Sequence, residues 1–208
     1  MAVQTDQESH PPAKARRKRQ DNRREGLLDA AAGQFAQHGF HAVTMREIAA
    51  DAGMLAGSVY YHFKSKDELL VAVYEEGVKR LSHEVDRVVA GIAEPWRRLE
   101  IACRAHTEML LEDSDYAQVI MRVFPDDVPS SRDRLTSLRD GYEERFRTMI
   151  EFLPVPATTN RTALRFTLLG ALNWSKSWYR PGGMNPRQIS AEVIKLLKYQ
   201  LAEEDSER

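Results

Sequence analysis

Apolar residues recur along this chain with the spacing of amphipathic helices, and no segment alternates as a β-strand would. The first apolar stripe consists of Leu27, Leu28, Ala31, Phe35 and Ala36. It predicts a helix that starts near Asp21, and Gly39 is placed where a glycine commonly ends a helix.

Two capping boxes follow this helix. Thr44 with Glu47 predicts the start of a short helix, and Ser65 with Glu68 predicts the start of a longer one. Gly53 interrupts the first of these helices, and residues 55–63 form another. The first 65 or so residues therefore predict three short helices, with a fourth that leads into the rest of the molecule.

Further helices are expected downstream, separated by prolines at the joints. They cover residues 95–112, 116–123, 131–152, 160–178 and 186–201. The chain is therefore expected to be all-α, with an N-terminal three-helix domain and a C-terminal multi-helix domain. The expected divisions are a disordered basic arm at 1–20, the small domain at 21–67 and the larger domain at 68–208.

Charge is unevenly distributed, although the formal net charge of the 208 residues is only -1. Seven cations and a single acid lie between residues 14 and 24, and Arg16, Arg17 and Arg19 belong to this run. A basic arm of this kind can follow the phosphates of DNA or enter its minor groove, whereas many such runs are only solvated tails.

Cysteine usage and hydropathy point to the cytoplasm. Cys103 is the only cysteine, so no intrachain disulfide can form, and no apolar run approaches the length of a membrane span. The polar N-terminus has no apolar stretch of the signal-peptide kind. A cytoplasmic protein is the expectation.

The segment 44–63 has the pattern of two helices that cross through a tight turn. Ala49 and Gly53 are the small residues that such a crossing requires, and Ala56, Gly57 and Ser58 would give the second helix a small front that fits a major groove. The polar residues that follow are suited to contact with phosphates. They are Tyr60, Tyr61, His62, Lys64 and Lys66.

As an ordered set, these motifs resemble the DNA-binding domain of the TetR family of transcriptional regulators. The resemblance covers residues 24–70 and rests on segments 28–31, 35–40, 44–49, 52–53 and 58–63, with Lys66 and Leu69. It implies that Thr44, Tyr60 and Lys66 contact backbone phosphates, and that base edges are read from Ala56, Gly57, Ser58, Tyr61 and His62, with Arg46 also at the DNA. The family usually has Ser or Thr where this chain has Leu55, so a phosphate contact is not transferred to that position.

The C-terminal helices resemble the pair that forms the four-helix dimer interface in this family. The residues expected in the interface are Phe166, Leu169, Ala171, Leu172, Ile189, Val193, Leu196 and Leu197. An ordinary intrachain core is the alternative. Two-fold pairing would also double the DNA site that a single helix-turn-helix reads.

A short run from Trp178 to Gly183 resembles a loop in members of the family that govern the degradation of fatty acids, aromatic acids and sterol rings, several of which respond to acyl-CoA thioesters. Arg180 could contact a phosphate or carboxylate. Alternatively, the run could simply form a turn that its aromatic residues pack against the protein. The expected ligand region comprises Cys103, His106, Met109, Met121, Phe124, Tyr142, Phe146, Trp174, Trp178 and Arg180, all of which core packing could equally explain.

The resulting hypothesis is a homodimeric repressor, released from double-stranded operator DNA by an acyl-CoA or a related hydrophobic carboxylate. Its three-helix helix-turn-helix domain for DNA binding would span residues 21–67, and its multi-helix domain for ligand binding and dimerisation would span residues 68–208. A multidrug-type regulator with a promiscuous pocket and a helical module without DNA binding are the alternatives. An enzyme is not expected, because the histidines show no metal-ligand spacing and no phosphate loop is present. Neither a metal nor a cofactor is expected.

Overall fold

The computed structural model describes residues 13–112 and 114–206, with side chains described for 22–112 and 114–201. These residues form α-helices and short 3-10 turns with no strand, which confirms the expected fold class. The helices are α1 (Ala13–His38), α2 (Met45–Asp51), α3 (Ala56–His62), α4 (Lys66–Val89), α5 (Pro95–Leu111), α6 (Asp115–Arg122), α7 (Arg132–Glu151), α8 (Arg161–Trp178) and α9 (Pro186–Ser206).

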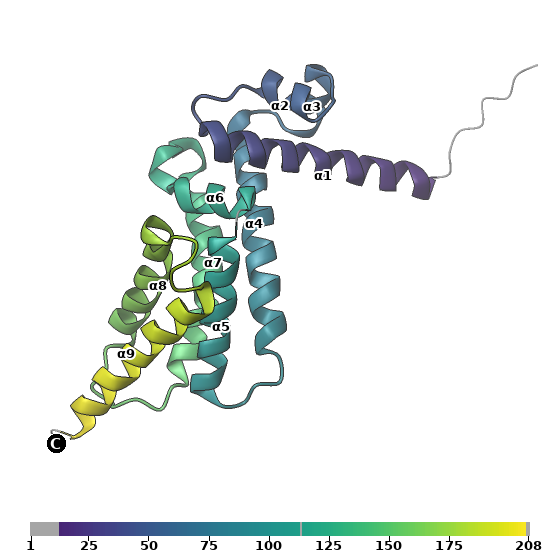
Figure 1. The fold of residues 1–208 in the computed structure, drawn as a ribbon. Coiled ribbons are helices and arrows are strands. Elements are labelled where there is room, and N and C mark those ends of the chain that lie inside the picture. Colours follow the sequence, from purple (N-terminus) through teal and green to yellow (C-terminus); the bar gives the residue numbers. More distant parts are fainter. Residues whose placement is uncertain (1–12, 113, 207–208) are drawn as a thin grey trace, which may run out of the picture.

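The first three helices form a small head at one end of the molecule (Figure 1). The predicted Thr44–Glu47 capping box is present at α2. The turn between α2 and α3 is a Schellman motif, since the N–H groups of Gly53 and Met54 donate to the carbonyls of Ala50 and Ala49. Gly53 has a φ of 63°, a conformation that favours glycine. α2 therefore ends at this turn, and the chain changes direction before α3 begins.

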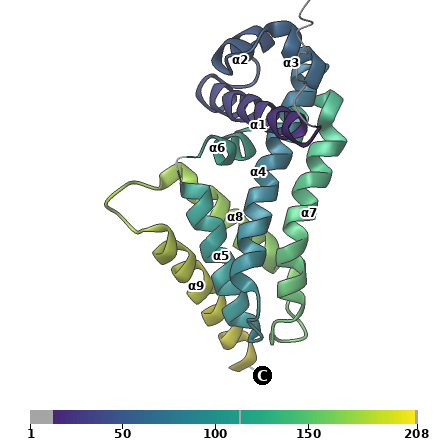
Figure 2. The ribbon, with the colours of Figure 1, turned by 90° about the vertical axis from the view of Figure 1, so that its right-hand side faces the viewer.

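The larger body consists of long helices that run alongside one another. α4 leads from the head into the body, α5 and α7 flank it, and α8 and α9 close one side (Figure 2). Side chains fix the starts of these helices: Glu94 caps α5, Asn160 caps α8, and Asn185 exchanges two hydrogen bonds with Gln188 at the start of α9. No described helix is long and apolar enough to cross a membrane.

The observed helices follow the expected ones closely except at the two ends of the chain. α1 begins at Ala13 rather than near Asp21, so the helix extends into the basic arm that was expected to be disordered. Residues 1–12 of that arm lie outside the described residues. At the other end, α9 continues to Ser206, beyond the expected end at 201.

Candidate nucleic-acid interface and apolar cavity

α3 is amphipathic, with a buried anchor and an exposed polar face. Val59 is fully buried, and Phe63 at the end of the helix is also in the core. Tyr61 is 78% exposed and Tyr60 is 53% exposed, and Gly57 and Ser58 lie on the surface with them, whereas Ala56 and His62 are partly buried. The residues expected to read base edges, together with Tyr60, therefore share one short helix at the surface of the head (Figure 1).

The N-terminus of α2 contributes a second exposed group beside α3. Thr44 directs both its N–H and its hydroxyl to Glu47 Oε2, each at 2.7 Å. These two hydrogen bonds lower the pKa of Glu47 below its ordinary value, and the one from the hydroxyl has the larger effect. Arg46 and Lys64 are exposed and hold positive charge near the same surface. Leu55 is the N-cap residue of α3, and its side chain makes no capping hydrogen bond because it is apolar.

Lys66 has a structural role that differs from the phosphate contact implied by the resemblance. Its ammonium donates to the carbonyl oxygens of Phe40 at 2.7 Å, Val43 at 2.8 Å and His41 at 3.3 Å. It also lies 4.5 Å from the centre of the Phe40 ring. All three N–H donors of the ammonium are thereby used. Lys66 therefore holds the loop between α1 and α2 and is not part of the proposed DNA interface.

Arg16, Arg17 and Arg19 are placed by the structure on the N-terminal part of α1. Their side chains lie outside the described ones. In Figure 1 this part of the helix extends away from the body on the side where α2 and α3 lie.

The head is joined to the body through contacts between α1 and α6. Tyr116 donates a 2.8 Å hydrogen bond to Asp29 Oδ1, and Arg80 stacks over the Tyr116 ring at 4.1 Å. Burial is the main cause that raises the pKa of the Tyr116 phenol, and the hydrogen bond to Asp29 raises it further. A second bond links Arg122 at the end of α6 to the carbonyl of Ala36 in the last turn of α1.

A cavity of about 580 Å³ lies in the body, lined by residues of α4, α5, α6, α7 and α8 and open on one side. This volume is within the range of small-molecule sites. The wall is mostly apolar, and includes Val78, Leu81, Leu110, Ile120, Met121, Val123, Phe124, Leu169 and Trp174. Of the residues expected in the ligand region, His106, Met121, Phe124, Tyr142 and Trp174 line it.

A buried polar cluster forms one part of the cavity wall. His106 Nε2 lies 3.0 Å from Asn173 Oδ1, and Nδ1 lies 2.7 Å from the Tyr142 hydroxyl. Because the amide oxygen can only accept, Nε2 carries the proton and Nδ1 accepts from Tyr142. Burial lowers the pKa of His106 to about 4, so the ring is neutral near pH 7.

Positive charge surrounds the same cavity, and sequence patterns did not identify it. Arg122, Arg139 and Lys176 line the cavity together with one carboxylate, Glu143. Glu143 already pairs with Arg165 at 3.3 Å and lies 3.9 Å from Arg139 Nε. Among the described residues, Lys176 has no ion pair or hydrogen bond. Arg139 also pairs with Asp140 at 3.2 Å. Among the described residues, Arg122 and Lys176 are therefore the cavity-lining cations without a carboxylate partner, beside an apolar wall.

Several residues expected in the ligand region lie elsewhere. Cys103 and Phe146 are completely buried in the core, where burial raises the pKa of the Cys103 thiol. Trp178 and Arg180 are exposed at the end of α8, and Arg180 donates to the carbonyl of Tyr179. These four residues do not line the cavity.

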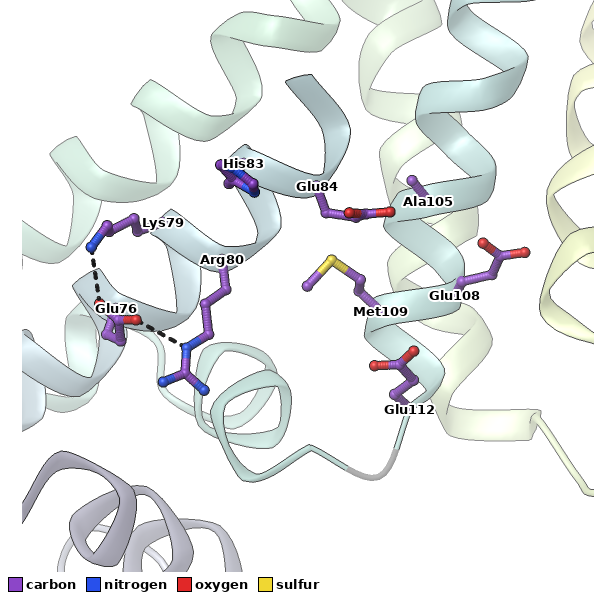
Figure 3. A pocket seen from close by; sticks show the side chains of 9 residues that line it. All are labelled: Glu76, Lys79, Arg80, His83, Glu84, Ala105, Glu108, Met109 and Glu112. Atoms are coloured by element: carbon purple, nitrogen blue, oxygen red, sulfur yellow. Dashed lines mark hydrogen bonds and ion pairs between the residues drawn. The ribbon is translucent and has the colours of Figure 1, made fainter. Parts of the chain in front are cut away.

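Met109 lines a different, external groove between α4 and α5, which Figure 3 shows. Acidic side chains from both helices surround it, among them Glu84, Glu108 and Glu112. Glu76 pairs with Lys79 and Arg80 at one end of this groove. Three residues are slightly less than one helix turn, so the directions of His106 and Met109 differ by about 60°. This difference is enough to place one side chain in the cavity and the other in the outer groove.

The residues expected at a dimer interface divide into exposed and buried sets. Leu169, Leu172 and Ile189 are buried within the protomer, so they cannot contact a partner directly. Val193 and Leu197 are half-buried against the core. The expected residues that are exposed are Phe166 and Ala171 on α8 and Leu196 on α9. Three further exposed residues, Trp174 and Trp178 on α8 and Tyr199 on α9, complete the set that we call the apolar face on α8 and α9.

Comparison with known protein families gives two matches that together cover most of the chain. Residues 27–73 match the bacterial regulatory proteins of the tetR family, and residues 93–201 match a tetracyclin repressor-like C-terminal domain. The second match alone spans half of the chain.

Curated relatives are transcriptional regulators rather than enzymes. The repressor KstR2 of Mycobacterium tuberculosis strain H37Rv is 27% identical over 85% of this chain and 92% of its own length. KstR2 of Rhodococcus jostii strain RHA1 is 30% identical over 77% of this chain and 81% of its own length.

Solved structures show the same fold. AibR in complex with isovaleryl coenzyme A and operator DNA has a TM-score of 0.71 and 23% identity, with coverage of 84% of this chain and 97% of AibR. FadR of Bacillus subtilis in complex with stearoyl-CoA has a TM-score of 0.74 and 20% identity, with coverage of 83% and 96%. The exposed α3 of a helix-turn-helix, the all-helical body and both domain matches lead to one conclusion: this chain belongs to the TetR family of transcriptional regulators.

Proposed function

We propose that the chain is a homodimeric repressor that holds operator DNA with α3 and releases it when an acyl-CoA or related hydrophobic carboxylate occupies the body cavity. It would act in the cytoplasm, with the division between DNA-binding and ligand-binding domains near residue 67. The observation that carries the ligand class is the cavity, whose apolar wall is bordered by Arg122, Arg139 and Lys176. An acyl chain matches such a wall, and a carboxylate or phosphate matches such cations.

For the DNA contact, the exposed face of α3 is the proposed reading surface. Gly57 and Ser58 are small enough to let the helix approach the base edges, and Tyr60 and Tyr61 present hydroxyls to the groove and the phosphates. Arg46 and Lys64 add backbone contacts. We also propose that Arg16, Arg17 and Arg19 on the extended part of α1 add affinity with little sequence preference.

For the dimer, the apolar face on α8 and α9 is the proposed interface. Trp174 is 70% exposed and Leu196 is 67% exposed, and large apolar side chains that gather on one face favour a partner over water. Trp174 also lines the cavity. A partner that covers this face would therefore cover the outer side of a cavity-lining residue, which connects dimerisation with ligand binding.

A multidrug-type regulator is a weaker match to this cavity. Lipophilic cations are the usual ligands of such a pocket. Here the one carboxylate that lines the cavity is already paired, whereas the cations Arg122 and Lys176 have no carboxylate partner among the described residues. Like charges in a partly desolvated site repel each other. The cavity charges therefore favour an anionic ligand.

The test uses the full-length protein and a duplex from the upstream region of its own gene. Fluorescence anisotropy would measure duplex affinity alone and with stearoyl-CoA, isovaleryl-CoA or free coenzyme A. We expect at least one thioester to weaken duplex binding about tenfold or more, with little effect of free coenzyme A. The same measurement would be made with stearic acid, isovaleric acid and cationic dyes. If neither the thioesters nor these acids changed duplex affinity, while the cationic dyes did, the ligand assignment would be overturned.

A further inference from the structure

A groove of about 400 Å³ lies between α5 and α9, apart from the cavity just described. On α5 it is lined by Arg97, Ile101 and Arg104, whereas the cavity is lined by His106 and Leu110. Arg104 and His106 are two residues apart on a helix, so they point in nearly opposite directions. The groove and the cavity therefore open on different sides of α5.

The lining of this groove is strongly basic. It contains five cations and a single carboxylate, Glu100. The cations are Arg97, Arg104, Arg187, Lys195 and Lys198. Apolar side chains of Ile101, Ala191 and Ile194 complete the wall. Concentrating one sign of charge in a concave site raises the local potential and attracts an ion of the opposite sign.

Four of the five cations already have acidic partners, three of them within 3.6 Å. Lys198 lies 2.5 Å from Glu100 Oε1, and Arg97 lies 3.6 Å from the other oxygen of the same carboxylate. Lys195 pairs with Glu192 at 3.4 Å. The fourth pair, Arg104 with Glu108, is the loosest at 3.9 Å, and among the described residues Arg187 has no acidic partner.

Arg104 has a buried donor without an acceptor. Its Nε is inaccessible to solvent and makes no hydrogen bond, because the nearest carboxylate oxygen, on Glu108, is 3.9 Å away. Buried donors without a partner are rare, since they cost free energy. The Arg104 side chain is still 33% exposed, so the rest of its guanidinium is open to the groove.

Arg187 occupies an electrostatically unfavourable position. It is the second residue of the 21-residue helix α9, where the helix dipole presents its positive end. Within the part of the chain that the structure describes, its guanidinium has no hydrogen bond or ion pair. An anion in the groove would relieve this repulsion and would also provide an acceptor for the outer nitrogens of Arg104.

We propose that the groove between α5 and α9 binds a phosphorylated small molecule, a phosphate or diphosphate ester, through the guanidinium groups of Arg104 and Arg187. Lys195 and Lys198 add charge at its rim. The volume suits a ligand of nucleotide size. The site lies in the body, away from α2 and α3 (Figure 1), so it does not require contact with operator DNA.

Isothermal titration calorimetry of the full-length protein with inorganic pyrophosphate at low ionic strength tests this proposal. The test variant carries Arg104→Gln and Arg187→Gln. The matched control carries Arg132→Gln and Arg134→Gln, which removes two exposed arginines that pair with Asp126 and Glu75 outside the groove. We expect saturable binding of one pyrophosphate per protomer, at least about tenfold weaker in the test variant and unchanged in the control.

Further arms separate the sources of the anion and the competing explanations. Tighter binding of adenosine diphosphate than of pyrophosphate would support a nucleotide ligand, and equal binding would support a free phosphate anion. The proposal is overturned by an absence of saturable binding up to millimolar concentration, by equal loss in both variants, or by sulfate binding as tightly as pyrophosphate. If the double variant did not fold, Arg187→Gln alone, at an exposed position, would give the same decision.

Discussion

The Arg122 guanidinium donates a 2.5 Å hydrogen bond from Nη1 to the carbonyl oxygen of Ala36. Arg122 lines the body cavity, and Ala36 belongs to the last turn of α1 in the head. A cation at the C-terminal end of a helix also interacts favourably with the helix dipole. One side chain therefore lines the proposed ligand site and also contacts the helix on which α2 packs.

Replacing Arg122 with glutamine should weaken the coupling between the two sites. In the proposed repressor, a ligand that displaces the Arg122 side chain changes the support of α1, and the variant lacks this link. Allosteric couplings are typically 1–3 kcal/mol, or roughly 5–150-fold in affinity. We expect the ratio of duplex affinities without and with stearoyl-CoA to be at least about fivefold smaller in the variant, as measured by anisotropy.

The matched control is Arg134→Gln, because Arg134 is an exposed arginine that pairs with Glu75 and does not line the cavity. It should keep the wild-type ratio. If Arg122→Gln kept that ratio as well, the Arg122–Ala36 bond would have no role in release.

Stability should fall as the pH is lowered below the ordinary pKa of histidine, because His106 is neutral in the fold. Its pKa is about 4 in the folded protein and about 6.5 in the unfolded chain. Between these values the unfolded state binds more protons, so the free energy of unfolding decreases as pH falls. From pH 7 to 5.5, we expect His106 to account for a loss of about 1 kcal/mol in urea unfolding.

His106→Gln should show a smaller pH dependence over the same interval, since this side chain does not titrate. The control His83→Gln replaces an exposed histidine of α4 and keeps His106, so it should lose stability as the wild type does. Equal slopes for wild type and His106→Gln would contradict the buried, neutral state of His106.

Adding a methyl group at Gly77 should reduce the size of the cavity. A Cβ at this position would lie 2.7 Å from Ile120 Cδ1, so the Ile120 side chain, which lines the cavity, must move. Overpacking typically costs about 1–3 kcal/mol, and the change from glycine to alanine in a helix returns up to about 1 kcal/mol. We therefore expect Gly77→Ala to fold and to bind stearoyl-CoA about tenfold more weakly in a tryptophan fluorescence titration.

Gly141→Ala on α7 is the control, because a Cβ there meets nothing within 4 Å. It should keep the ligand affinity and gain up to about 1 kcal/mol of stability in urea unfolding. Equal affinities in the two alanine variants would show that the space beside Gly77 is not used by the ligand.

Charge placed on the apolar face of α8 and α9 should prevent dimerisation. In the variant with Phe166→Arg and Leu196→Arg, two exposed apolar side chains become cations that would face their own copies across a two-fold axis. Sedimentation velocity should show a monomer, and duplex affinity should fall at least about tenfold because one head reads only half of the site. A variant that remained dimeric would place the interface elsewhere.

The head was largely predictable from the sequence because its signals are local. A capping box, a turn glycine and the alternation of buried Val59 with exposed neighbours all lie within about twenty residues, and each has a short-range physical cause. Lys66 is the exception. Its three carbonyl partners belong to the loop between α1 and α2, and nothing near Lys66 in the sequence indicates them.

The cavity was only partly predictable because its wall and the core have the same composition. His106 lines the cavity while Cys103, three residues earlier, is in the core, and Met109, three residues later, faces the outer groove. The rotation of α5 about its axis decides between these environments, and tertiary packing sets that rotation. Arg122 and Lys176 were missed since isolated cations on helices are usually solvated.

The assignment of α3 as the DNA-reading helix is tested most directly by a variant without the two tyrosine side chains of this helix. Tyr60→Ala with Tyr61→Ala removes two exposed side chains, so the fold should be retained, as a thermal unfolding curve can verify. Phe152→Ala, at an exposed aromatic residue just after α7 in the body, is the control.

Fluorescence anisotropy with the upstream duplex at moderate salt gives the decisive comparison. We predict that the double tyrosine variant binds the duplex at least about tenfold more weakly than the wild type, since lost groove and phosphate contacts cost about 1–3 kcal/mol, whereas Phe152→Ala binds normally. A folded double variant that held the duplex as tightly as the wild type would contradict the assignment.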